Sequence, residues 1–135
     1  MSDENARYVR ITLALVGSAL IAVGPVTLLA PDTAASAFGI PATTAETKAY
    51  LLASAMRDVA LGSFLLAALA RRASRRLLAG YVLALAFVAA ADATNVAAYT
   101  ARHGGASALV VHVGGVVVLA ALVWSLRRAT GCPSI

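Results

Sequence analysis

Long apolar runs separated by short polar or basic segments dominate the chain. Four runs, at residues 11–30, 49–70, 77–99 and 107–126, come close to the roughly 20 residues that an α-helix needs to cross a bilayer. The Arg-rich segment 71–76 between the second and third runs is short, so we expect a tight hairpin of neighbouring helices there. The pattern predicts one all-α domain over residues 1–135, an integral membrane bundle of four transmembrane helices.

A short interfacial helix is expected between the first two runs, within the longest connection at residues 31–48. Asp32 can cap its start, and Gly39 followed by Pro41 stops it. The apolar residues between these points would hold the helix at the membrane surface, as a roof over a cavity below. An ordinary loop with one helical turn is the alternative.

Composition supports a membrane protein. The chain is 61% hydrophobic and 13% charged, with a mean hydropathy of +0.84, whereas soluble domains are roughly 45 to 50% apolar. The single cysteine, Cys132, excludes an internal disulfide and a multi-cysteine metal or redox pair. The net charge of +5 comes from Arg residues that flank the apolar runs without interleaved aromatics, so the expected partner is the bilayer and not a nucleic acid.

The distribution of basic residues predicts an orientation in the plasma (cell inner) membrane. One side would carry eight Arg residues and the other only Lys48 and Arg102, so the positive-inside rule places both termini and the turn at 71–76 in the cytoplasm. The first run also resembles a signal peptide ahead of Ala35-Ser36-Ala37, although it is long for that role. The eight are Arg7, Arg10, Arg71, Arg72, Arg75, Arg76, Arg127 and Arg128.

Ionisable residues occur inside three of the apolar runs. Arg57 and Asp58 lie in the second, Asp92 in the third and His112 in the fourth, all roughly 8 to 14 Å below the outer edge at 1.5 Å per residue. A charge near the centre of a span costs about 2.5 to 3.5 kcal/mol on insertion scales, so these groups should pair. We expect Arg57 to bind the carboxylate of Asp92 on the neighbouring helix with two parallel hydrogen bonds, because Asp58 lies about 100° away on the same helix as Arg57. Asp58 is then left for His112 or water.

This polar layer is the candidate site. Asp58 or Asp92 together with His112 would move a proton, and Arg57 would hold a developing negative charge or fix a carboxylate. Residues sharing helix faces with the two carboxylates are the candidate substrate-binding residues: Ser54, Asn95 and Tyr99.

Purely structural roles are the alternative for these residues. The ion pair could serve only to keep the helices in register, and His112 could make a hydrogen bond between helices. Asp58, Asp92 and His112 form a conceivable metal set, but paired ligand spacings are absent, so no metal and no other cofactor is expected. Small residues are expected to be points of close helix packing: Gly17, Ser18, Gly62, Gly80, Gly114 and Gly115.

The chain resembles a small family of four-helix integral membrane proteins known only as a domain of unknown function. The matching features are Pro31 with Phe38-Gly39-Ile40-Pro41 after the first helix, Arg57-Asp58 with Leu61-Gly62 in the second, Asp92 in the third and His112 in the fourth. The resemblance covers almost the whole chain and implies that the four ionisable residues are signature positions. It brings no established activity, and the glycine that the family carries before the Arg-Asp pair is replaced here by Ala55-Met56.

Three functions remain open. The first is an intramembrane polar pocket that binds a small lipophilic molecule, with or without acid/base isomerisation or cyclisation, so whether the protein is an enzyme is undecided. The second is a small proton-coupled exporter acting as a homodimer, and the third is a non-catalytic membrane partner subunit. A cavity of roughly 300 Å³ or more would favour the first, and the confinement of all carboxylates to the outer half argues against the second.

Overall fold

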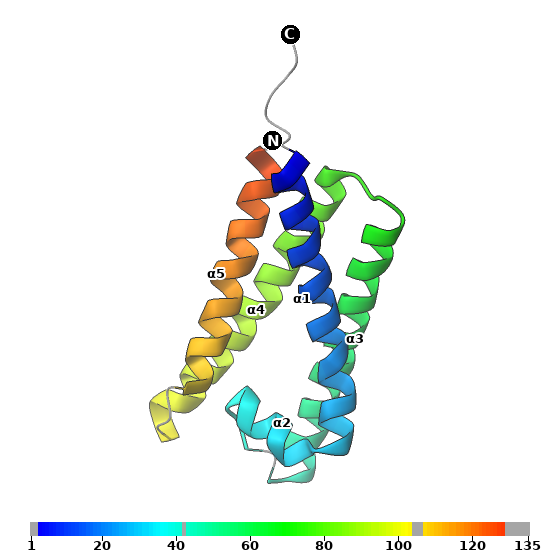
Figure 1. The fold of residues 1–135 in the computed structure, drawn as a ribbon. Helices are drawn as coiled ribbons and strands as arrows, with labels where there is room; N and C mark the ends of the chain where they lie inside the picture. The colour runs from blue at the N-terminus through cyan, green and yellow to red at the C-terminus, as the bar shows by residue number, and fades with distance from the viewer. Residues whose placement is uncertain (1–2, 42, 104–106, 129–135) are drawn as a thin grey trace.

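The computed structural model describes residues 3–41, 43–103 and 107–128, and within these ranges every element is helical. The order is α1 (Asp3–Leu29), α2 (Pro31–Phe38), α3 (Ala45–Ala70), α4 (Arg75–His103) and α5 (Ser107–Arg128) (Figure 1). All but α2 are long and apolar enough to span a membrane. The predicted all-α bundle of four spans with one short additional helix is therefore confirmed. Cys132 and the glycine pair at 104–105 lie outside the described residues.

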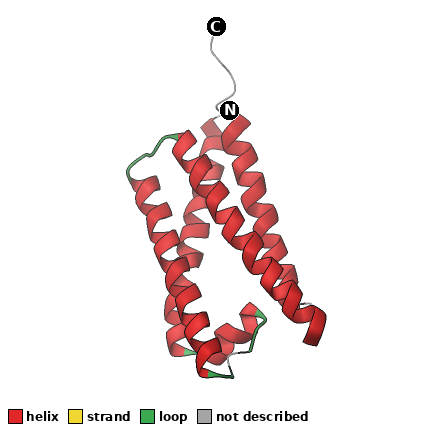
Figure 2. Cartoon of the chain, turned by 180° about the vertical axis from the view of Figure 1, so that it is seen from behind, coloured by secondary structure: helices red, strands yellow, loops and turns green. Residues whose placement is uncertain are grey.

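The four long helices are arranged as two pairs. α1 packs along α3, and α4 packs along α5, with fewer contacts between the pairs. The pairs lie close together at the end that carries the N-terminus and diverge toward the end where α2 lies (Figures 1 and 2). The prediction that α3 and α4 pack against each other as a tight hairpin is wrong, because α3 packs mainly against α1.

Close packing of α1 against α3 depends on glycine. A Cβ added to Gly62 would lie 2.5 Å from the carbonyl oxygen of Gly17, and one added to Gly24 would lie 2.5 Å from Val59 Cγ2. Small residues thus let these two helices approach each other, as lipid-buried helices often do. The prediction of close helix packing is wrong for three other glycines, since a Cβ added to any of them would meet nothing within 4 Å: Gly80, Gly114 and Gly115.

Buried apolar side chains concentrate in the half of the bundle where the two pairs meet. We call this the closed half. Hydrogen bonds also cross between helices there: Tyr81 Oη donates to Leu61 O over 2.5 Å, and Arg10 Nη2 donates to Leu69 O over 3.1 Å. The closed half is defined by its buried core: Leu13, Leu65, Leu78, Ala79, Val82, Leu85, Leu119, Leu122, Val123 and Leu126.

The short helix α2 turns the chain back across the opposite half, the open half. Pro31 occupies its first turn, where the missing N–H of proline costs nothing. Asp32 also lies in that turn, so the prediction that it caps the helix is wrong; the cap position is Ala30, which makes no side-chain bond. Gly39 ends the helix as predicted, with a left-handed φ of 85° that glycine adopts without strain.

Candidate functional site: a polar corner in an apolar cavity

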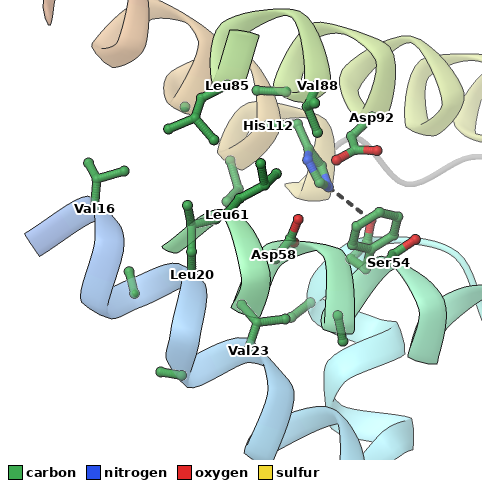
Figure 3. A pocket seen from close by; sticks show the side chains of 18 of the residues that line it. Val16, Leu20, Val23, Ser54, Asp58, Leu61, Leu85, Val88, Asp92 and His112 are labelled. Atoms are coloured by element: carbon green, nitrogen blue, oxygen red, sulfur yellow. Dashed lines mark hydrogen bonds between the residues drawn. The ribbon is translucent and has the colours of Figure 1, made fainter. Parts of the chain in front are cut away.

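A cavity of about 580 Å³ lies between the two helix pairs in the open half, and all five helices contribute to its lining. Its walls are mainly aliphatic side chains (Figure 3). α2 closes it on one side with Ala34, Ala37 and Phe38, while Leu85 and Leu119 of the closed half form its other end. The polar groups of the lining gather chiefly in one corner: Ser54, Asp58, Asp92 and His112.

Arg57 links the two carboxylates of this corner. Its Nη2 lies 2.8 Å from Asp92 Oδ2, and Nη1 lies 3.3 Å from Asp92 Oδ1, so the guanidinium meets that carboxylate with two parallel hydrogen bonds. This is the pairing between α3 and α4 that the sequence predicted. Asp92 is buried, with its side chain only 10% exposed, and an unpaired carboxylate would be costly there.

Asp58 is held by the same guanidinium. Its Oδ1 accepts from Arg57 Nε at 3.0 Å and from Nη2 at 2.9 Å. The expectation that Asp58 would be left for His112 or water is therefore wrong, because Nε reaches the neighbouring residue while the end of the guanidinium crosses to α4. Within the described residues, Asp58 Oδ2 accepts no hydrogen bond, and the side chain lines the cavity (Figure 3).

His112 connects α5 to the short helix. Its Nε2 lies 3.2 Å from the carbonyl oxygen of Phe38, and the two rings meet edge to face with centroids 5.0 Å apart. A carbonyl can only accept, so Nε2 carries the proton in this bond. The structural role that the sequence left open for His112 thus has a partner, in α2, while the ring still borders the cavity (Figure 3).

The structure separates the three candidate substrate-binding residues. Ser54 is buried and lines the cavity beside Asp58. Asn95 and Tyr99 line a different pocket of about 390 Å³, and Tyr99 stacks on His103 with centroids 4.2 Å apart. Asn95 is turned by about 60° from Asp92 around α4, and Tyr99 lies two turns further along, beyond the cavity.

One polar residue of the cavity was missed from the sequence. Thr27 of α1 is buried and lines the cavity, and its Oγ1 donates to Val23 O over 2.8 Å. A lone threonine that bonds its own helix backbone leaves no pattern in a sequence. Only the position of α1 against the other helices brings it to the site.

The cavity has a lateral opening between α1 and α5. Val23 and Val26 of α1 line it while 37% and 46% exposed, and Val111 and Val118 of α5 line it while 67% and 45% exposed. Residues that both border the cavity and face outward mark its mouth.

The arrangement defines the class of protein: a multi-pass helical membrane protein with ionisable groups inside the span. Among the described residues, no group of three or more His, Cys, Asp or Glu side chains is placed to hold a metal ion. Residues 17–126 match the model of the family described as domain of unknown function DUF4267, and the chain belongs to that family. Comparisons with curated proteins and with solved structures gave no match.

Proposed function

We propose that this protein binds one small lipophilic molecule in the cavity of the open half, with the polar end of the molecule at Asp58, Asp92 and His112. The observation that carries the proposal is a cavity of about 580 Å³ with aliphatic walls and one polar corner. Ligand sites in proteins have this size and this combination of lining groups.

Access would be lateral. The mouth between α1 and α5 is framed by valines, and a lipophilic molecule concentrates in the bilayer that surrounds it. We place the Arg-rich end of the bundle at the cytoplasmic side of the plasma membrane, by the positive-inside rule. The cavity then lies in the outer half of the bilayer.

Acid/base isomerisation or cyclisation is the chemistry that we assign to the corner if the bound molecule is turned over. Asp58 and His112 border the cavity and are the candidate proton carriers. Arg57 is not part of the lining, and all three of its guanidinium nitrogens contact carboxylates. Its proposed role is therefore to position Asp58 and Asp92, not to meet a developing negative charge.

The exporter receives less support from the geometry. Alternating access requires the site to open to both sides in turn, and the end of the cavity toward the termini is blocked by the buried core of the closed half. The partner-subunit function would leave a cavity of this size without a role.

Two adjacent glycines of α5 allow a direct test. Gly115 lines the cavity and Gly114 does not, and a side chain at either meets nothing within 4 Å at its Cβ. We expect Gly115→Leu to fill the cavity and Gly114→Leu to leave it open, with similar effects on folding. Native mass spectrometry of the purified protein should find a small lipophilic molecule on the wild type and on Gly114→Leu, with at least about a tenfold lower occupancy on Gly115→Leu. Equal occupancy in both variants, or an unoccupied wild type, contradicts the proposal.

A further inference from the structure

The charges around the cavity are unbalanced. Two carboxylates, Asp58 and Asp92, line it, and the single guanidinium of Arg57 serves both. Among the described residues that line the cavity there is no Arg and no Lys, since Arg57 lies behind the two carboxylates and not in the lining. With His112 neutral, the corner therefore carries one negative charge in excess, in surroundings where an uncompensated charge is expensive.

The hydrogen-bonding groups of the corner also favour a ligand that donates hydrogen bonds. Arg57 already occupies both oxygens of Asp92 and Oδ1 of Asp58, and Asp58 Oδ2 has no donor among the described residues. The Nε2–H of His112 is directed to the carbonyl of Phe38. The corner thus presents an anionic acceptor to the cavity, while its strongest donors are engaged elsewhere.

Resting on the proposed function, we infer that the ligand is a lipophilic amine whose ammonium group binds against Asp58. An ammonium group supplies the missing cation and donates up to three hydrogen bonds, with Asp58 Oδ2 as its charged acceptor and the Ser54 hydroxyl as a neutral one. A carboxylate or phosphate at the same place would add a second excess negative charge and would find no free Arg or Lys among the described lining residues. The site therefore selects against fatty acids and phosphate esters.

Three probes with the same alkyl chain and different polar ends test this inference: octylamine, octan-1-ol and octanoate. Binding to the protein in neutral detergent at pH 7 is measured by calorimetry, with thermal unfolding as a second readout. We expect octylamine to bind at least roughly tenfold more tightly than octanoate. The formal net charge of the chain is +5, so non-specific attraction would favour octanoate, and a preference for the amine must come from the cavity.

Asp58→Asn removes the excess charge and keeps the shape of the side chain, so the preference for octylamine over octan-1-ol should disappear. Asp32→Asn is the matched control, because this exposed carboxylate at the start of α2 is not part of the cavity lining. It should leave the preference unchanged.

The outcomes separate the two proposals. Binding of octan-1-ol and octanoate that Gly115→Leu abolishes, without a preference for the amine, would overturn the inference and leave the lipophilic site standing. The inference about the amine also fails if Asp58→Asn keeps the preference. If Gly115→Leu binds all three probes as the wild type does, both proposals fail.

Discussion

The closed and open halves of the bundle share the four long helices but differ in the interactions that hold these helices together. In the closed half, aliphatic side chains from all four long helices fill the centre, and Leu13, Leu65 and Val82 are fully buried. In the open half, the helix pairs separate around a cavity of about 580 Å³. Polar connections cross this half: Arg57 with Asp92 between α3 and α4, and His112 with the Phe38 carbonyl between α5 and α2.

This difference shows how a small membrane protein can keep a cavity. Helices in lipid gain little from burying apolar surface against one another and associate through close packing and hydrogen bonds. Where packing is complete, as in the closed half, the buried side chains of neighbouring helices contact one another directly. Where a cavity takes the place of the core, directional bonds between charged groups can hold the helices at a distance that packing alone would not maintain.

The ion pair of the open half should give the largest effect on stability. Asp92→Asn leaves Arg57 with Asp58 alone and removes the charged bond to α4. We expect a loss of about 2 to 3 kcal/mol in the free energy of unfolding, less than for a fully buried pair because the Arg57 side chain is 33% exposed. Thermal and denaturant unfolding in detergent measure it, with the exposed Asp32→Asn as control. Equal stability of the two variants would show that packing, and not the ion pair, holds the open half.

Alanine substitutions at two valines, one in each half, compare how much side-chain packing contributes to stability in the two halves. Val82 is fully buried in the closed half, while Val23 borders the cavity and is 37% exposed. Val82→Ala should cost about 1.5 to 2 kcal/mol, because the two lost methyl groups leave a void. Val23→Ala should cost less than about 0.5 kcal/mol in the same unfolding assay, since its side chain already lacks neighbours on one side. Similar losses for both would contradict the division into two halves.

The bond from His112 to α2 should have the smallest and most local effect. His112→Ala removes one hydrogen bond and one edge-to-face ring contact, so α2 should open about five-fold more often, a change of about 1 kcal/mol. Hydrogen exchange of the α2 amides is the measurement. His103→Ala, at an exposed histidine that stacks on Tyr99, is the control and should leave α2 unchanged. Unaltered exchange in His112→Ala would mean that the short helix is held by its apolar contacts.

Much of the candidate site could be predicted from the sequence, because depth along a spanning helix is a local property. Counting residues from the helix ends was enough to put Arg57, Asp58, Asp92 and His112 in one layer, and the cost of isolated charges pointed to the bond between Arg57 and Asp92 that the structure shows. The sharing of Arg57 by Asp58 could not be foreseen in this way. It depends on how far the guanidinium must reach, and so on the distance between α3 and α4.

The sequence by itself determined the four long apolar helices, the short helix ended by Gly39 and the common level of Arg57 and Asp92 along their helices, because these follow from apolar length, backbone preference and helical rise. Only the tertiary structure decided that α1 pairs with α3 and α4 with α5, that a cavity lies between the pairs, and that Tyr99 lies outside it. The reason is physical. Helices that are apolar on every side carry no pattern that distinguishes a lipid-facing surface from a partner-facing one, so complementary packing at residues such as Gly17 and Gly62 selects the neighbours.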